Sequence, residues 1–109
     1  MRFIVITCVV SFAFCPSLRA AESPDFEKGV APLLVRRCLG CHNASEAKGG
    51  LVLTTREGLL RGGESGAALA PGKPEESHLL ERVEKGEMPP EEKGKSKALP
   101  KAEVELLKS

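Results

Sequence analysis

The sequence predicts a small all-α domain in which short helices and long loops surround a bound cofactor. Apolar residues recur at helical spacing in several segments, while no strand pattern extends beyond three residues. The connecting segments are long and rich in glycine, which is unusual for a compact domain unless a cofactor organises them. A chain of 109 residues also buries a low fraction of its surface, so it needs a staple, a metal or a cofactor.

The N-terminus predicts a secretory signal peptide over residues 1–20. Arg2 precedes the uncharged apolar run 3–14, and the small pair Ala20-Ala21 follows a short polar stretch. An uncleaved anchor is the alternative, although the run is shorter than the roughly 20 residues of a membrane helix. Cys15 is a weak candidate for lipid attachment because Phe14 stands where a small residue is expected. We therefore expect an exported protein, periplasmic or otherwise extracytoplasmic, whose mature domain contacts no membrane unless this segment is retained.

Cleavage leaves a nearly neutral domain over residues 22–109. Loss of Arg2 and Arg19 leaves fourteen basic residues against fifteen acidic ones, a net charge of −1. A chain without basic excess is a poor ligand for a phosphate backbone, so we expect no nucleic-acid partner. Cleavage also removes Cys8 and Cys15, and Cys38 and Cys41 are then the remaining cysteines.

The first helix is predicted from Ser23, with Ser23 as N-cap and Pro24 at the first helical position. Pro32 should kink this helix or divide it in two, because proline lacks an N–H donor and crowds the preceding turn. The apolar stripe of this helix comprises Phe26, Val30, Leu33 and Leu34.

Three further helices are predicted after a loop over residues 43–53. Thr54 and Glu57 have the spacing of a capping box for a helix that ends at Gly62-Gly63. The next helix begins near 74–76 and stops at Gly86, with Leu79, Leu80 and Val83 as its apolar stripe. Residues 87–90 are non-helical, and a charged loop leads to a last helix that starts at Leu99-Pro100.

The segment Cys38-Leu39-Gly40-Cys41-His42 is the attachment motif of a c-type haem. Two cysteines separated by two residues at the end of a helix reach the vinyl groups on one edge of a porphyrin. The adjacent histidine then lies beneath the ring, where its imidazole binds the iron. The motif therefore predicts one covalent haem c.

Three other interpretations compete with haem attachment. A structural zinc needs four N or S ligands, and the sequence offers no second cysteine pair. A thioredoxin-like redox pair needs a βαβ setting, which is not predicted. A Cys38–Cys41 disulfide suits an exported protein but leaves His42 unexplained.

Met88 is the candidate for the second axial position of the iron. Apart from the two motif cysteines, it has the only sulfur atom of the mature chain, and the rigid Pro89-Pro90 follows it. A methionine ligand raises the reduction potential relative to two histidines. His78 is the rival, but its position on the third helix predicts a solvated side chain, away from the Leu79 stripe.

Both the cysteine motif and Gly86-Glu87-Met88-Pro89-Pro90 resemble the planctomycete-type cytochrome c domain, as do the strings REGLLRGG and ALAPGKPEESHLL. The resemblance covers essentially all of the mature chain and implies a class I cytochrome c-like fold. It also implies that Cys38 and Cys41 bind the haem, with His42 proximal and Met88 distal. In that family the last helix is longer and a larger exported protein follows. We therefore expect a domain truncated at its C-terminal helix, the N-terminal module of a longer protein.

The function expected from these features is single-electron transfer with an unknown redox partner or fused domain, without enzymatic activity. A haem enzyme or ligand sensor with an open sixth iron position is the alternative, for which His78, Arg56 and Arg61 are candidate distal residues. We expect an unfilled pocket without haem, and hence a poorly folded apo-protein. The residues expected around it are Phe26, Leu33, Leu34, Leu39, Leu79, Leu80 and Val83.

Overall fold

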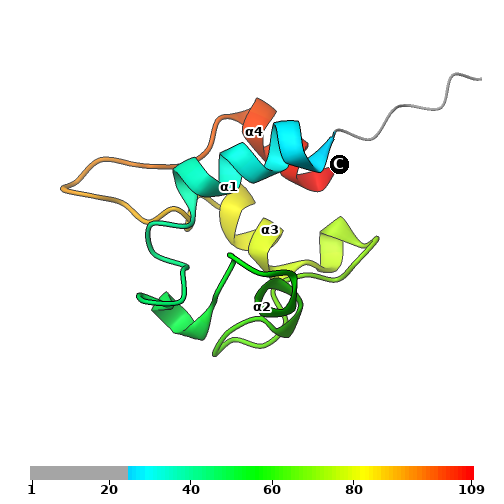
Figure 1. Cartoon of the computed structure of the whole chain (residues 1–109). Coiled ribbons are helices and arrows are strands. Elements are labelled where there is room, and N and C mark those ends of the chain that lie inside the picture. The colour runs from blue at the N-terminus through cyan, green and yellow to red at the C-terminus, as the bar shows by residue number, and fades with distance from the viewer. Residues whose placement is uncertain (1–24) are drawn as a thin grey trace, which may run out of the picture.

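A computed structural model describes residues 25–109 as short helices joined by loops (Figure 1). The predicted signal segment and the predicted N-cap Ser23 lie outside these described residues. No strand forms between residues 25 and 109, so this part of the chain is all-α as predicted. The elements in chain order are η1 (Phe26–Val30), α1 (Ala31–Arg37), η2 (Lys48–Gly50), α2 (Arg56–Arg61), η3 (Pro74–Glu76), α3 (His78–Glu84) and α4 (Lys101–Lys108).

The first helical segment changes from a π-helix, η1, to an α-helix, α1, beside Pro32, and the backbone stays helical across the change. Pro32 lies in the first turn of α1. Asp25 caps the segment, since its side chain accepts a hydrogen bond from the Glu27 amide at 3.0 Å. The cap is thus Asp25 and not the predicted Ser23.

The cap of α2 also differs from the prediction. Thr55, and not Thr54, is the N-cap, and its hydroxyl accepts a hydrogen bond from the Gly58 amide at 3.0 Å. The predicted capping box with Glu57 therefore does not form, because a box requires the acid three residues after the cap. Gly62 ends α2 with a positive φ of 76°, as the Gly62-Gly63 pair predicted.

The predicted third helix is divided into η3 and α3. Ser77 lies between them in an extended conformation, and its buried hydroxyl accepts a hydrogen bond from the Ala70 amide at 3.0 Å. This contact fixes the loop before α3 and displaces the helix start to His78. Gly86, with a φ of 71°, stops the helix where predicted.

The core lies between α1, α3 and α4. α1 and α4 are neighbours, α3 lies beneath them, and α2 is at the opposite side of the molecule (Figure 1). Leu33, Val83 and Leu99 form the buried cluster of this core. Leu33 from the predicted first stripe is fully buried, whereas Phe26 remains 53% exposed.

An ion pair joins the end of α1 to α4. The Arg37 guanidinium donates from Nε to Glu103 Oε2 at 2.9 Å and from Nη2 to Oε1 at 3.2 Å. Both side chains are partly buried, and the paired geometry is specific to arginine and a carboxylate. The contact holds α1 immediately before Cys38.

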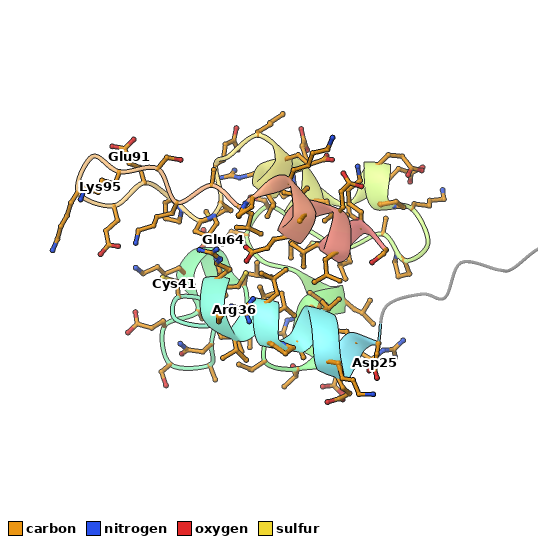
Figure 2. The ribbon with its side chains drawn as sticks, turned by 90° about the horizontal axis from the view of Figure 1, so that it is seen from above. Asp25, Arg36, Cys41, Glu64, Glu91 and Lys95 are labelled. Atoms are coloured by element: carbon orange, nitrogen blue, oxygen red, sulfur yellow. The ribbon has the colours of Figure 1, made fainter. Side chains whose placement is uncertain are left out.

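The segment after Pro90 extends away from the helices, with Glu91 and Lys95 on it (Figure 2). Two backbone hydrogen bonds between Glu92 and Lys95, at 3.0 and 2.9 Å, close its turn. Within residues 25–109, none of the helices combines the length and the apolar character required to cross a bilayer.

Candidate functional site

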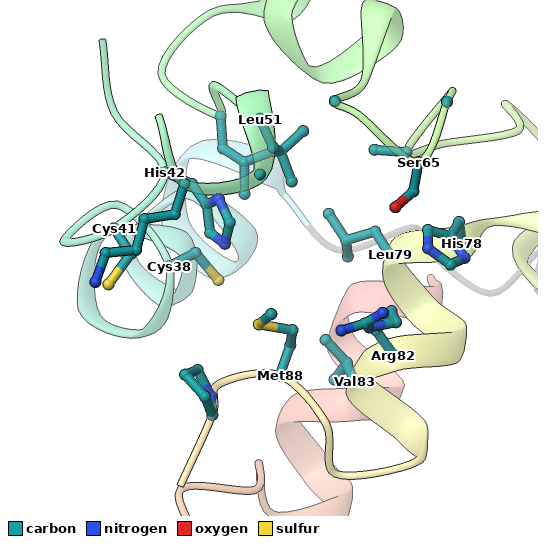
Figure 3. Close-up of a pocket in the computed structure, with 17 residues that line it drawn as sticks. Cys38, Cys41, His42, Leu51, Ser65, His78, Leu79, Arg82, Val83 and Met88 are labelled. Carbon is teal, nitrogen blue, oxygen red and sulfur yellow. The ribbon is translucent and has the colours of Figure 1, made fainter. Parts of the chain in front are cut away.

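A cavity of about 230 Å³ lies between the cysteine motif, the glycine-rich loops, α3 and the Met88 turn (Figure 3). It brings together all four residues predicted for haem binding: Cys38, Cys41, His42 and Met88. The rest of its wall is largely apolar. Besides Met88, the apolar side chains are Leu51, Leu53, Ala68, Leu79, Val83 and Pro90.

The backbone at the end of α1 positions the cysteine motif. Cys38 is the C-cap of α1, and its amide donates to the Leu34 carbonyl at 2.8 Å. The His42 amide donates to the Cys38 carbonyl at 3.0 Å, which continues one turn beyond the helix. The Leu53 amide then donates to the His42 carbonyl at 2.9 Å, so the motif is tied to the neighbouring segment that also lines the cavity.

Asn43 fixes the turn that follows the motif, a role that the sequence analysis missed. Its Oδ1 accepts hydrogen bonds from the amides of Ser45 and Glu46, both at 2.9 Å. Its Nδ2 donates to the Leu39 carbonyl at 2.8 Å. An asparagine directly after a motif is typical of such a side-chain turn, so the signal was present in the sequence.

The two thiols of the motif are free and half-buried. Burial raises the pKa of the Cys38 thiol above its ordinary value, and the nearby Arg37 charge opposes this rise. Cys38 is therefore held as the neutral thiol at neutral pH. Within residues 25–109, no three His, Cys, Asp or Glu side chains are grouped as a metal ion would require.

The His42 ring faces the cavity (Figure 3). Its Nδ1 is buried and has no hydrogen-bond partner among the described residues. A buried polar atom without a partner costs free energy and calls for an explanation, such as a bound group. An imidazole, two thiols and a thioether around one apolar cavity are the donor set of a covalent haem, so these residues fit that group.

Met88 lies across the cavity from the motif (Figure 3). The amides of Glu87 and Met88 both donate to the Arg82 carbonyl, at 2.9 and 3.2 Å. Met88 also packs against the buried cluster of Leu33 and Val83. Its side chain is thus held by both the turn and the core.

The His78 side chain is 40% exposed, in line with the solvated side chain that the sequence predicted. It lines the same cavity as Met88, and its Nδ1 lies 3.4 Å from Glu81 Oε2. The sequence did not predict that this exposed side chain also lines the cavity, because the faces of α3 meet both the core and the cavity. Leu79 and Arg82 lie on the cavity side with His78.

The cavity is also lined by Lys48, Ser65 and Arg82, and none of these three was predicted from the sequence for this site. Arg82 lies four residues after His78, a spacing that places both on one helix face and was readable in the sequence. The two arginines considered as distal residues, Arg56 and Arg61, are not among the lining residues.

The expected ring of apolar residues around the pocket was mostly wrong. Leu79 and Val83 line the cavity, and Leu39 does not. Leu33 is in the core cluster instead. A second groove of about 290 Å³ receives the other predicted residues, Phe26, Leu34 and Leu80.

The fold and the site together define an all-helical domain built around a cavity for a prosthetic group. The family model described as Planctomycete cytochrome C matches residues 38–92, just over half of the 109-residue chain. The chain belongs to this cytochrome c family, as the resemblance predicted. The match includes the cysteine motif and Met88. Comparison with curated proteins and with solved structures gives no match.

Proposed function

We propose that this domain binds one haem c covalently and transfers single electrons. The observation that carries the proposal is the meeting of Cys38, Cys41, His42 and Met88 at one apolar cavity. Membership of the cytochrome c family supports haem binding and electron transfer. The four side chains come from two segments more than forty residues apart in the sequence, so it is the fold that brings them to one cavity.

The residues divide the work of holding the haem. Cys38 and Cys41 would form the thioether bonds, while His42 and Met88 would bind the iron. When bound, the haem supplies a one-electron couple whose potential is raised by methionine ligation. The apolar wall would limit the access of water to the iron, and this access also affects the reduction potential of the haem.

We further propose that the domain is exported after removal of residues 1–20. The apolar run at the N-terminus and the haem-attachment motif, which needs a compartment with haem-attachment machinery, motivate this location. Its partner is a second redox protein or a domain fused to this one. Such a partner is recognised when it oxidises or reduces the holo-protein in a stopped-flow absorbance experiment.

Intact mass under denaturing conditions tests the attachment. The chain is expressed in a host with haem-attachment machinery, and the exported product is compared with a Cys38→Ser/Cys41→Ser variant. We expect the parent chain to retain the mass of one haem after denaturation and to lack residues 1–20, because thioether bonds survive denaturation. The variant should lose the haem. A parent chain that carries no haem mass would overturn the proposal.

A haem enzyme or ligand sensor is the second candidate function, and one observation favours it. His78 and Arg82 line the cavity, where a peroxidase-like reaction would use a distal histidine or arginine. This function requires that Met88 does not bind iron, so the ferric spectrum of a Met88 variant separates the two candidates.

A further inference from the structure

The side chains at the two ends of the cavity differ in their chemistry. The two thiols lie at one end, and Ser65, His78 and Arg82 lie at the other, beyond Leu79 (Figure 3). Apolar side chains form most of the wall between them. At the end away from the thiols, the Arg82 guanidinium beside the polar side chains of Ser65 and His78 indicates a subsite for an anionic group, while a second cation, Lys48, lines the cavity beside Cys41.

The Arg82 guanidinium is only partly engaged by the protein. Among the described residues, its ion pair joins Nε to Glu87 Oε2 at 2.9 Å. A guanidinium has five N–H donors in a planar fork, so its Nη groups remain for a further acceptor. A carboxylate is the acceptor that this fork matches best, since it takes two parallel hydrogen bonds.

His78 is positioned for the same acceptor. It lies one helical turn before Arg82 on the cavity side of α3, and Glu81 engages its Nδ1 at 3.4 Å. The second ring nitrogen is thereby left for a ligand in the cavity.

Haem has carboxylates on the edge opposite the two vinyl groups. We propose that Arg82, together with His78, binds these haem carboxylates, an inference that rests on the proposed function. The thiols of Cys38 and Cys41 fix the vinyl edge at one end, and the carboxylate edge then meets the end of the same cavity that Arg82 and His78 line. The orientation follows from the place of the two thiols, because Lys48 lines the cavity beside Cys41 and a cation is therefore present at both ends.

Arg82 also connects this subsite to Met88. Its carbonyl accepts the hydrogen bonds of the Glu87 and Met88 amides that form the turn. The side chain of Arg82 therefore has a role in carboxylate binding, while its backbone has a role in positioning Met88. A side-chain substitution separates the two, because it leaves the carbonyl in place.

Infrared spectroscopy of the holo-protein tests the contact directly. Haem labelled with ¹³C at its carboxyl carbons identifies the carboxylate stretching bands. We expect Arg82→Gln to shift these bands and to lower the reduction potential, because an uncompensated carboxylate charge favours the oxidised iron. Arg82→Lys should have an intermediate effect, since it keeps the charge and loses the fork.

Two matched controls exclude indirect effects. Lys85→Gln removes the same charge from a residue that pairs with Glu81 and does not line the cavity, so the bands should stay in place. Glu87→Gln breaks the ion pair of Arg82 but keeps the guanidinium, and the bands should again show a bound carboxylate. Unchanged bands in Arg82→Gln, or equal shifts in Lys85→Gln, would overturn the inference.

A failure of this inference can be told apart from a failure of the proposed function. A chain without covalent haem removes the function, and no labelled band is then observed. If the chain carries covalent haem but its carboxylate bands are the same in Arg82→Gln, the proposed function stands and only this inference is overturned. Should Arg82→Gln yield too little holo-protein, His78→Gln provides the same measurement, with a smaller shift expected.

Discussion

At the scale of the residue, Met88 is fixed by its turn and by the core together. The Arg82 carbonyl receives its amide, and its side chain packs beside Val83. A methionine with these contacts has little freedom to leave the cavity. These contacts hold Met88 at the cavity, and iron binding by its sulfur stays a prediction.

Substitution of Met88 tests that role. We expect Met88→Ala to change the ferric absorption spectrum from six-coordinate low-spin to high-spin. The reduction potential should fall by about 0.1 V or more, within the roughly 0.8 V over which axial ligands tune haem iron. Absorption spectra and a reductive titration of the holo-protein give both values.

His78→Ala is the control for Met88, because His78 lines the same cavity without being the expected ligand. Its ferric spectrum should remain low-spin. A high-spin parent spectrum that Met88→Ala leaves unchanged would instead support the haem enzyme or sensor.

At the scale of the element, α2 depends on its cap. The helix has six residues, and a helix of that length is unstable without tertiary contacts and caps. Gly58 is buried in it, and a Cβ at this position would collide with the Val52 carbonyl oxygen. This close approach holds α2 against the segment that lines the cavity.

Two neighbouring threonines separate the observed cap from the predicted one. We expect Thr55→Ala to lower the free energy of unfolding of the holo-protein by about 1 kcal/mol, because the Gly58 amide loses its acceptor. Thr54→Ala should change it by less than half of that. Denaturant unfolding measures both variants, and the reverse order would restore the capping box predicted from the sequence.

At the scale of the whole molecule, the domain has a small core. Among residues 25–109, the buried apolar residues are Leu33, Leu34, Leu53, Ala68, Leu80, Val83 and Leu99. The cavity lies between the cysteine motif and α3, and the core cluster of Leu33, Val83 and Leu99 joins α1 to α3. A domain of this size buries little surface, so a group bound in the cavity would add substantially to its stability.

We therefore expect the apo-protein to be poorly folded. The Cys38→Ser/Cys41→Ser variant, prepared without haem, should show reduced helicity and no cooperative thermal transition by circular dichroism. The covalent holo-protein is the control and should unfold cooperatively. A sharp transition in the apo-protein would mean that the helices are stable without the haem.

The helical class, the cysteine motif, the stop at Gly86 and the position of Met88 were predictable because each depends on a few neighbouring residues. Local spacing, proline and glycine are sufficient for such features. The predicted positions of two N-caps were wrong by one or two residues, because the observed caps Asp25 and Thr55 have neighbours that are equally suitable as caps.

The sequence by itself determined that two thiols and an imidazole would stand at the end of a helix, with a methionine far along the chain. Only the tertiary structure decided which side chains share their cavity. His78 and Arg82 line it, while Phe26 lies in the other groove. The reason is that periodicity identifies a helix face but not what covers it. On α3, the core and the cavity cover two faces, and the packing of distant segments determines which residues meet each.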